Sequence, residues 1–441
     1  MRIVLASFSS LPNSIGGGEV HLYELAQALK RGGHQPSILT VKSVCGDKVE
    51  VTEKEFNGLV IHQLTVPPCI SIYDRDPKLT AWATAWLAEQ KADVLHLFLF
   101  NQLLGLIPAA NQLGIPVCMT GLEFSYFCRR YDLMHRGHQR CALDQRGSTC
   151  EQCVLSSYSQ NQRLIAGIAR LLPANAESGA RRFVARTFGD LLPGLGQRGI
   201  TRQIEQQRAN FNREIAAVIT PSSVMKDFYL AQGADPAKLH FVPYGTNVRP
   251  IENEHVTRNG HLRVGYIGRL DPKKGVDVLC EALRKLPPHL PVQVKIFGPV
   301  DNGSASYASR LQGHADADSR IKLMGKLDRD RVADAYNEID VLVVPSIWYE
   351  NSPITISESL SHKCPVVCSD TAGMTDLIQH EVNGLTFATG ESNALSDCLR
   401  RLVDEPELLP RLRRSVKPVE TTQEISRRIV KVYEDVRRQS V

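Results

Sequence analysis

The amino-acid sequence predicts an α/β protein of two domains, each built on a mainly parallel β-sheet. Short apolar runs such as Ile3–Ser7 and Val341–Val344 alternate along the chain with segments of helical period. This alternation is typical of buried parallel strands that are joined by helices. The chain has 441 residues, which is enough for two separate hydrophobic cores.

The first domain is predicted to span residues 1–248 and to open with the strand Ile3–Ser7. A glycine-rich loop then precedes a predicted helix at Glu19–Arg31, whose apolar residues share one face. Gly17 and Gly18 leave backbone N–H groups exposed before this helix, and such groups bind a phosphate or a sugar hydroxyl. A flexible turn without a ligand is the alternative.

Further elements follow in the same alternating order, after a region that we expect to be irregular up to residue 80. We expect helices at 79–90 and 221–233, and strands at 93–99, 116–120 and 215–220. The second domain, residues 249–415, begins within a linker at 248–260. Its predicted strands lie near 262–267, 292–297, 321–324, 341–344, 365–368 and 385–387. The C-terminal segment 416–441 contains an amphipathic helix at 421–438.

Composition and charge argue against several classes of protein. The net charge is +5, from 52 basic and 47 acidic side chains, which does not indicate a nucleic-acid partner. No run of about 18 apolar residues predicts a transmembrane helix, and the N-terminal apolar run is too short for a signal peptide. Eleven cysteines without such a signal favour a reducing compartment. We therefore expect a cytoplasmic protein.

Residues 345–360 carry the strongest functional pattern. They follow a predicted buried strand and lead into a predicted helix, with Ser352 as the N-cap and Pro353 in the first helical position. In an open α/β sheet, ligands bind outside the carboxyl ends of the strands. Glu350 is therefore expected at a ligand, and Glu358, about one turn into the helix, is expected to face the same crevice.

A basic pattern follows the first predicted strand of the second domain, with Gly-Arg-Leu at 268–270 and Lys-Lys-Gly at 273–275. Together with the two glutamates, which form a Glu-x7-Glu pair, it resembles the retaining glycosyltransferases of family 4, which have the GT-B fold. The resemblance covers nearly the whole chain and is strongest from 242 to 384.

This resemblance implies two Rossmann-like domains that face a cleft, with the C-terminal helix crossing back to the first domain. It implies a hexosyltransferase-like enzyme that moves a sugar from a nucleotide-diphosphate sugar to a glycan or lipid-linked acceptor. Polysaccharide or glycoconjugate synthesis, with retention of the anomeric configuration, is the implied context. No cofactor is implied for catalysis.

The resemblance also implies roles for individual residues. Arg269 and Lys274, or Lys273, stabilise the charge that grows on the departing diphosphate, which is often the largest catalytic contribution. Glu358 accepts hydrogen bonds from the ribose, and Glu350 contacts the donor sugar. The rest of the expected donor site is made of Gly268, Asn351, Ser352, Pro353 and Ile354.

One position departs from the family pattern. Family members carry a histidine on the loop after the strand that ends at Thr120, and here Leu122 or Glu123 takes its place. Leu122 has no polar group, whereas Glu123 accepts a hydrogen bond and His96, on the neighbouring strand end, donates or accepts one. We predict that Glu123, or otherwise His96, holds the donor sugar or the acceptor. A purely local pairing of Glu123 with an arginine is the alternative.

A group of cysteines lies in the predicted loop 121–160. Cys128, Cys141, Cys150 and Cys153 have the spacing C-x12-C-x8-C-x2-C among polar residues. Four thiolates on a short loop close a tetrahedral zinc site, so we predict one structural zinc. Unrelated reduced cysteines, a redox pair and an iron–sulfur site are the alternatives.

The segment 160–213 is predicted to be an insertion with a charge balance of +6. Its apolar residues recur at helical spacing between arginines. Basic amphipathic segments lie on anionic membrane surfaces, so peripheral contact with the inner face of a membrane is one prediction. A solvated helical pair that caps the first domain is the other.

Two other functions are compatible with the sequence. One is a nucleotide-sugar isomerase of the same fold, such as a 2-epimerase, which would turn over the donor without an acceptor. The other is a protein that binds nucleotide sugars without catalysis, which the absent histidine keeps open.

Overall fold

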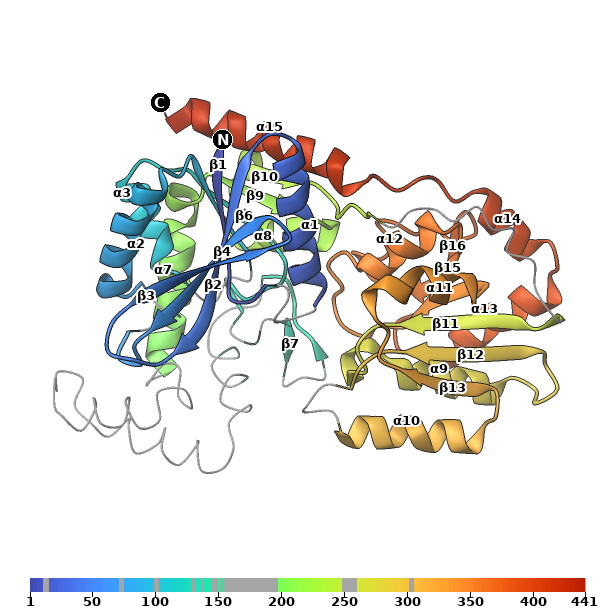
Figure 1. Cartoon of the computed structure of the whole chain (residues 1–441). Helices are drawn as coiled ribbons and strands as arrows, with labels where there is room; N and C mark the ends of the chain where they lie inside the picture. The colour runs from blue at the N-terminus through green and yellow to red at the C-terminus, as the bar shows by residue number, and fades with distance from the viewer. Residues whose placement is uncertain are drawn as a thin grey trace. The chain divides into compact units, whose positions relative to one another are not determined.

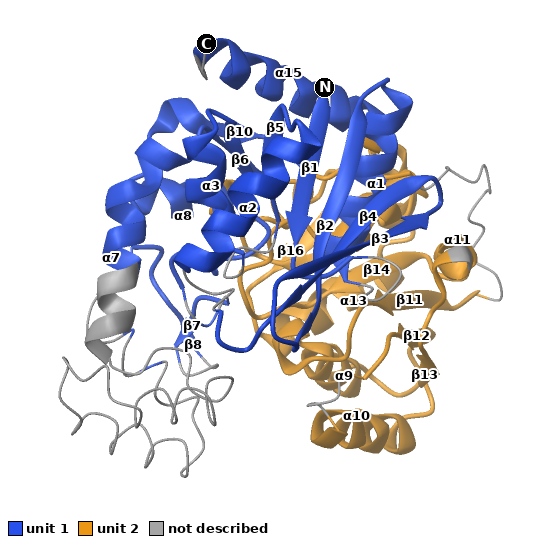
Figure 2. Cartoon of the chain, turned by 60° about the vertical axis from the view of Figure 1, so that its left-hand side comes forward, with its two compact units in different colours: residues 1–221, 225–243, 423–441 blue, residues 222–224, 244–422 orange. Residues whose placement is uncertain are grey.

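The computed structural model describes residues 1–10, 16–70, 75–98, 103–128, 130, 132–135, 139–144, 150, 153, 197–247, 260–300 and 305–440 (Figure 1). Its backbone divides into two compact units, which Figure 2 shows in different colours. Unit 1 contains residues 1–221, 225–243 and 423–441, and unit 2 contains residues 222–224 and 244–422. The predicted boundary at 248/249 lies outside the described residues.

Unit 1 is built on an eight-stranded sheet in the order β10-β9-β6-β5-β1-β2-β4-β3. Its strands are β1 Arg2–Ser7, β2 Gln35–Val44, β3 Glu50–Phe56, β4 Leu59–Val66, β5 Val94–Leu97, β6 Val117–Thr120, β9 Ala217–Thr220 and β10 Leu239–Phe241. Every pairing is parallel except that of β3 with β4. The helices are α1 Gly17–Arg31, α2 Pro77–Gln90, α3 Leu106–Gln112, α7 Gln197–Glu214, α8 Ser223–Ala231 and α15 Thr422–Ser440.

Unit 2 is built on a six-stranded, fully parallel sheet in the order β13-β12-β11-β14-β15-β16. Its strands are β11 Leu262–Ile267, β12 Val292–Phe297, β13 Ile321–Gly325, β14 Val341–Val344, β15 Val366–Ser369 and β16 Gly384–Phe387. The helices are α9 Val276–Lys285, α10 Ala305–Ala317, α11 Val332–Asn337, α12 Ile354–Ser361, α13 Ser392–Asp404 and α14 Leu408–Arg414. The strand order reverses between β11 and β14, which makes this the topological switch point where α/β sheets bind ligands.

The C-terminal helix α15 is part of the hydrophobic core of unit 1. Ile425, Ile429 and Tyr433 are fully buried in one cluster with Ile3 and Leu5 of the central strand β1. The apolar positions of α15 recur every three or four residues, so one face of the helix covers the sheet, as Figure 1 shows for the red helix. Burial of these side chains stabilises the attachment of a segment that is remote in sequence.

Two local predictions were wrong. The region up to residue 80 is not irregular, because β3 and β4 form an antiparallel hairpin. Its turn, Asn57–Gly58, has φ values of 49° and 75°, which suit the tight turn that an Asn-Gly pair favours. Ser352 does not cap α12, because the N-cap is Pro353, with φ −61° and ψ 114° and no side-chain cap.

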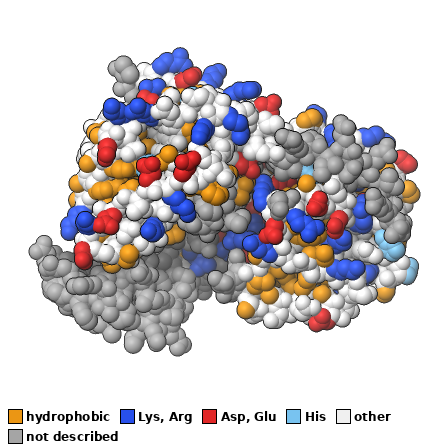
Figure 3. Space-filling view, viewed as in Figure 1, with side chains coloured by type: hydrophobic (Ala, Val, Ile, Leu, Met, Phe, Trp, Pro, Cys, Tyr) orange, Lys and Arg blue, Asp and Glu red, His pale blue; other side chains and the backbone are white. Residues whose placement is uncertain are grey.

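One face of the described surface carries both signs of charge (Figure 3). Basic and acidic side chains are interspersed over the face shown in Figure 3. Among the helices that the structure describes, none combines the length and the apolar character that crossing a bilayer requires.

Candidate functional site

Four glycines allow loops to meet at the carboxyl ends of β11 and β14 in unit 2. A Cβ atom on Gly275, which has φ 66°, would overlap the carbonyl of Pro345, and one on Gly373, with φ 94°, would overlap the carbonyls of Glu350 and Asn351. Gly268 and Gly298 follow the neighbouring strands β11 and β12 and approach each other as closely. Glycine is required at positions 275, 298 and 373 because any side chain there would push the loops apart.

Glu350 is the buried anion of this loop cluster. Its side chain is 6% exposed, and the Lys274 Nζ lies 2.7 Å from its Oε1. The Ser346 hydroxyl donates to the same oxygen at 2.5 Å. Burial alone would raise the pKa of Glu350, but the Lys274 ammonium and the Ser346 hydroxyl hold it below its usual value. The carboxylate is therefore ionised at neutral pH, and it fixes Lys274 in place.

The basic residues that the sequence singled out lie on the turn after β11. Asp271 caps the short 3-10 helix at 272–274 by accepting from the Lys273 N–H at 2.8 Å. Lys273 and Lys274 place their ammonium groups 5.7 and 5.1 Å from the centre of the Trp348 ring, within cation–π range. Arg269 is exposed on the same turn. The structure therefore brings Arg269, Lys273, Lys274 and Glu350 together on adjoining loops.

Asn351 is held by contacts from outside its own loop. The Ser222 hydroxyl donates to the Asn351 Oδ1 at 2.7 Å, and the Asn351 Nδ2 donates to the Tyr244 hydroxyl at 3.2 Å. Asp376 accepts from both the N–H and the hydroxyl of Ser223, at 2.7 and 2.6 Å. These contacts fix the backbone just before α12, which begins at Ile354 after the N-cap Pro353.

Glu358 lies within α12 and is 1% exposed. Arg329, from the 3-10 helix at 329–331, forms an ion pair with its Oε1. The buried Tyr336 hydroxyl, from α11, lies 3.2 Å from its Oε2 and 2.9 Å from the carbonyl of Thr355. Burial and the Glu358 carboxylate raise the pKa of Tyr336 well above its usual value, so the hydroxyl stays protonated and able to donate.

Sequence analysis missed Arg329 and Tyr336 as partners of Glu358. Arg329 lies 29 residues before it, in a segment that carries no motif. The aromatic and basic residues near 330 have the composition of an ordinary surface helix, so only the fold reveals the pairing.

The glycine loop of unit 1 already receives a carboxylate from its own helix. Gly16 is the N-cap of α1, and Gly17 and Gly18 are its first residues. Glu19 folds back so far that a Cβ on Gly16 would overlap its carboxylate. The Ser9 hydroxyl donates to the Glu19 Oε1 at 2.6 Å. A negative side chain at this helix N-terminus favours a neutral ligand group, such as a sugar hydroxyl, over a phosphate.

Glu123 has an unusual pKa on the loop after β6. Burial raises the pKa of its carboxyl to about 7, and repulsion from the carboxylates of Glu19 and Asp132 adds to the shift. Near neutral pH, the group therefore exists in both protonation states, so it either donates or accepts a hydrogen bond. The preceding residue, Leu122, is half-buried and packs against the core of unit 1.

His96 is a core residue. It is 0% exposed, its Nδ1 is hydrogen-bonded to the Tyr433 hydroxyl, and its Nε2 lies 2.8 Å from the Thr120 hydroxyl. Burial lowers its pKa to about 3, so the ring is neutral. Both ring nitrogens are occupied by the protein, and the alternative role that the sequence suggested for His96 is therefore not supported.

The cysteine group and the basic segment are only partly described. Cys128, Cys141, Cys150 and Cys153 are all among the described residues, and all are reduced. Most of the segment 160–213 lies outside the described residues, which resume at 197 with α7.

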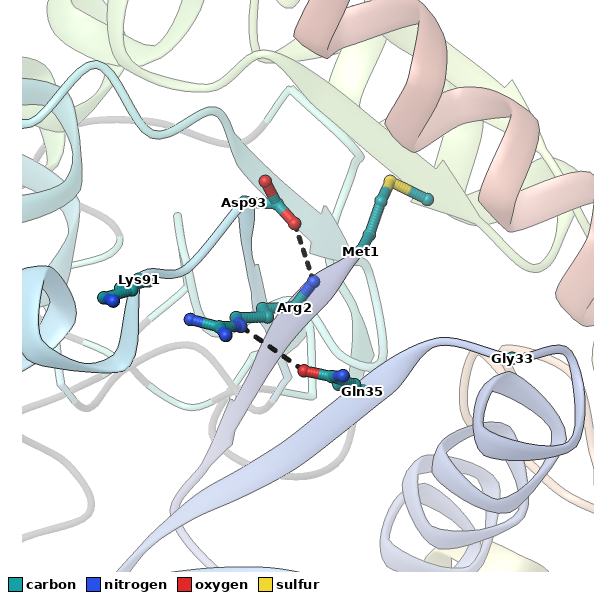
Figure 4. Close-up of a pocket in the computed structure, with 6 residues that line it drawn as sticks. All are labelled: Met1, Arg2, Gly33, Gln35, Lys91 and Asp93. Atoms are coloured by element: carbon teal, nitrogen blue, oxygen red, sulfur yellow. Dashed lines mark hydrogen bonds between the residues drawn. The ribbon is translucent and has the colours of Figure 1, made fainter.

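One surface cavity lies at the amino ends of the central strands of unit 1. It has a volume of about 420 Å³ and is lined by Arg2, Gln35, Lys91 and Asp93, among others (Figure 4). Its polar groups are engaged with one another: the Arg2 N–H donates to Asp93 at 2.7 Å, and the Arg2 Nε donates to Gln35 at 3.3 Å. Arg437 of α15 binds the other Asp93 oxygen at 2.7 Å. The cavity lies at the amino ends of the strands, where such sheets do not place their ligands.

Two parallel-sheet units of Rossmann type, with a ligand-site pattern at the switch point of unit 2, define a protein of the GT-B fold. The family comparison identifies the chain further. Residues 16–245 match the model of the glycosyl transferase 4-like domain, and residues 248–418 match that of the glycosyl transferases group 1. The chain belongs to this glycosyltransferase family.

Similar proteins agree with this assignment. A D-inositol 3-phosphate glycosyltransferase of Rhodococcus erythropolis is 25% identical over 48% of this chain and 50% of its own length. The amylovoran biosynthesis glycosyltransferase AmsK of Erwinia amylovora is 28% identical over 36% of this chain and 40% of its own length. The chain thus spans half or less of the length of these relatives.

Among solved structures, the Anabaena protein HepE in complex with UDP superposes with a TM-score of 0.65. The alignment covers 100% of this chain and 99% of HepE, at 15% identity. This likeness shows the GT-B fold.

Proposed function

We propose that this protein is a glycosyltransferase that moves a sugar from a nucleotide-diphosphate sugar to a glycan or lipid-linked acceptor, with retention. The observation that carries the proposal is the loop cluster of unit 2. Its buried Glu350–Lys274 pair, the exposed Arg269 and the buried Glu358 all lie around one switch point. Family membership and the UDP complex of HepE support a nucleotide donor.

In this proposal, cations near the leaving group make the main contribution to catalysis. When the bond between the anomeric carbon and the oxygen breaks, negative charge grows on the departing diphosphate. Arg269 and Lys274 stabilise that charge, and Lys274 does so without reorganisation because Glu350 already holds it. Lys273, which shares the Trp348 ring, is the third cation of this turn.

Two carboxylates then bind uncharged hydroxyl groups of the donor. Glu350 contacts hydroxyls of the transferred sugar, and Glu358 accepts from the ribose hydroxyls. In the structure, Arg329 and Tyr336 hold the Glu358 carboxylate, so the ribose meets an acceptor whose orientation is already fixed. Gly268 and the segment Asn351–Ile354 supply backbone groups to the sugar and phosphate.

Glu123 replaces the family histidine in this proposal. A carboxyl with a pKa of about 7 donates to an oxygen when it is protonated and accepts from a hydroxyl when it is not. We propose that it contacts the donor sugar or the acceptor, with Gly17 and Gly18 offering N–H groups to sugar hydroxyls. The acceptor hydroxyl loses its proton to the departing phosphate, which is consistent with retention.

The basic segment 160–213 is proposed to bring the enzyme to an anionic membrane surface, where a lipid-linked acceptor lies. Its charge balance of +6 is the support for this step. The corresponding location of the enzyme is the cytoplasm, in contact with the inner face of the membrane.

The test is a turnover assay of the full chain with UDP-, GDP- and ADP-sugars. Released nucleoside diphosphate is measured with and without added glycan or lipid-linked acceptors. We expect release that depends on an acceptor and is lowered at least tenfold by Arg269→Ala. The matched control is Arg331→Ala, whose side chain is 67% exposed.

The same assay separates the other functions. Formation of an epimeric nucleotide sugar without an acceptor would indicate an isomerase. Donor binding without any turnover would indicate a binding protein. Full activity in both Arg269→Ala and Glu358→Ala would overturn the proposed donor site.

A further inference from the structure

Trp348 lies against the buried Glu350–Lys274 pair of the loop cluster in unit 2. Its indole nitrogen is fully buried, whereas the residue as a whole is half-buried. Burial raises the pKa of Glu350, but Lys274, Ser346 and the indole N–H of Trp348 together hold it below its usual value. The Lys274 ammonium also lies over the face of the same ring, with 5.1 Å between the Nζ and the ring centre. Trp348 therefore interacts with both partners of the ion pair.

A second ammonium group lies over the same ring. The Lys273 Nζ is 5.7 Å from the ring centre, and both lysines are half-buried. The attraction of an ammonium group to the negative face of an aromatic ring is stronger when the group is partly removed from water. This attraction also offsets part of the repulsion between two like charges that lie near one ring. The Trp348 ring thus stabilises the placement of both cations.

The backbone fixes the loop of Trp348 against the turn of the two lysines. The N–H of Ile347 donates to the Lys273 carbonyl at 2.9 Å. Gly275, at the end of the same turn, has no room for a side chain, because a Cβ there would lie 2.1 Å from the carbonyl oxygen of Pro345. The ring and the two ammonium groups therefore belong to segments whose relative positions are set before any ligand binds.

We propose that Trp348 is a positioning residue of the donor site, which holds the ammonium groups of Lys273 and Lys274 where the diphosphate binds. This inference rests on the proposed function, in which these cations stabilise the departing diphosphate. A lysine side chain has much rotamer freedom, and ordering it only when the ligand arrives would weaken binding. Cations that are already held in place also stabilise the transition state without reorganisation. Trp348 thus acts on the reaction through the two lysines.

The first experiment measures the binding of inorganic pyrophosphate to the full chain by calorimetry, because this probe carries the diphosphate without a base or a sugar. Trp348→Leu removes the aromatic ring, whereas Trp348→Phe keeps a ring and removes the indole N–H. We expect Trp348→Leu to weaken binding about fivefold or more, and Trp348→Phe to stay within about twofold of the wild type. Trp82→Leu is the matched control, because Trp82 is a half-buried tryptophan of unit 1. A loss in Trp348→Phe as large as that in Trp348→Leu would contradict a role of the ring face.

Two further measurements separate positioning from a merely structural role. In a double-mutant cycle, Trp348→Leu should weaken pyrophosphate binding less in a Lys273→Met background than in the wild type, because one of the cations that the ring holds is gone. Additive losses would mean that Trp348 does not act through Lys273.

Fluorinated tryptophan provides the second measurement, which does not depend on whether Trp348→Leu folds. Fluorine withdraws electrons from the ring face and changes the shape of the side chain little, so it weakens the attraction to a cation. Biosynthetic replacement of tryptophan by its fluorinated form should therefore weaken pyrophosphate binding in the wild type. It should have no effect in Trp348→Phe, which lacks the tryptophan concerned. Unchanged binding in the fluorinated wild-type protein would overturn the inference.

The turnover assay gives a third readout. Trp348→Leu should lower kcat more than it changes the KM for the donor, because the charge on the leaving group is largest in the transition state. Wild-type protein that binds neither pyrophosphate nor UDP, GDP or ADP would overturn the proposed function and this inference together. Pyrophosphate binding that is equally strong in the wild type and in Trp348→Leu would overturn this inference alone.

Discussion

Glu123→Gln is the substitution that tests the unusual carboxyl on the loop after β6. The folded protein holds the pKa of Glu123 at about 7, against an ordinary value of 4.5, chiefly because partial burial removes water from the carboxyl, while a hydrogen bond with Ser125 opposes the shift. A raised pKa means that folding favours the protonated form. The stability that this group contributes is fully present below pH 4.5 and is lost as the pH rises through 7.

The size of the effect follows from the two pKa values. Between pH 5 and pH 8, the wild-type protein should lose about 2.5 kcal/mol of unfolding free energy that the Gln variant keeps. Glutamine has nearly the same shape and cannot ionise, so it imitates the protonated carboxyl at every pH. The variant should therefore be within about 1 kcal/mol of the wild type at pH 5 and exceed it by about 3 kcal/mol at pH 8.

The assay is urea unfolding of unit 1 at a series of pH values, followed by tryptophan fluorescence. Trp82 and Trp86 stack in α2 of unit 1, with ring centroids 5.6 Å apart, while Trp348 lies in unit 2. A Trp348→Phe background makes the signal specific for unit 1. Glu55→Gln, at an exposed position of β3, is the control.

Two results would refute this reasoning. An equal difference between Glu123→Gln and wild type at pH 5 and pH 8 would mean that the carboxyl has an ordinary pKa. If Glu55→Gln departed from the wild type with pH in the same way as Glu123→Gln, the effect would not be specific to Glu123.

Three further predictions concern the ion pairs and the basic segment. Lys274→Met should destabilise unit 2 by about 3–5 kcal/mol, because it leaves the Glu350 carboxylate buried without its cation. Adding Glu350→Gln should restore most of the stability that is lost, as measured by thermal unfolding. A double variant as unstable as the single one would argue against the ion pair. Arg329→Ala should lower the unfolding free energy by about 1–3 kcal/mol, since the buried Glu358 loses one of its partners. Arg331→Ala, at a nearby exposed position, should lower it far less in the same measurement. Equal losses in the two variants would contradict the pairing of Arg329 with Glu358. Replacing Arg181, Arg182 and Arg186 with Gln should reduce the fraction of protein that sediments with anionic vesicles but leave transfer to a soluble acceptor unchanged. Equal binding of the wild-type protein to neutral and anionic vesicles would exclude an electrostatic mode.

The sequence predicted most of the strands in unit 2, because buried parallel strands are short, continuous apolar runs. β11, β12 and β14 lie where they were expected, at 262–267, 292–297 and 341–344. The hairpin of β3 and β4 was missed although Asn57–Gly58 carries the turn signal. Its first strand, Glu50–Phe56, is mostly exposed and charged, so it lacks the apolar run on which the prediction relied.

The partners within the candidate site could not be predicted in the same way. The Glu-x7-Glu spacing indicated Glu350 and Glu358, since both lie on one loop and helix. Arg329, Tyr336 and Ser346 reach these carboxylates through tertiary packing, and a single sequence carries no signal for such contacts. Burial is likewise a tertiary property, so the raised pKa of Glu123 was beyond the reach of a sequence pattern.

The pKa of Glu123 supports the proposal that this residue takes the place of the histidine that the family resemblance implies. An imidazole is useful at a sugar because its ordinary pKa of about 6.5 lets it donate or accept near neutral pH. An exposed glutamate lacks this property, because it is fully ionised there. Burial beside Glu19 and Asp132 moves the Glu123 carboxyl into the same range. Under the proposal, the environment of the loop gives the Glu123 carboxyl a protonation behaviour similar to that of an imidazole. Leu122, which is half-buried against the core of unit 1, then needs no polar role.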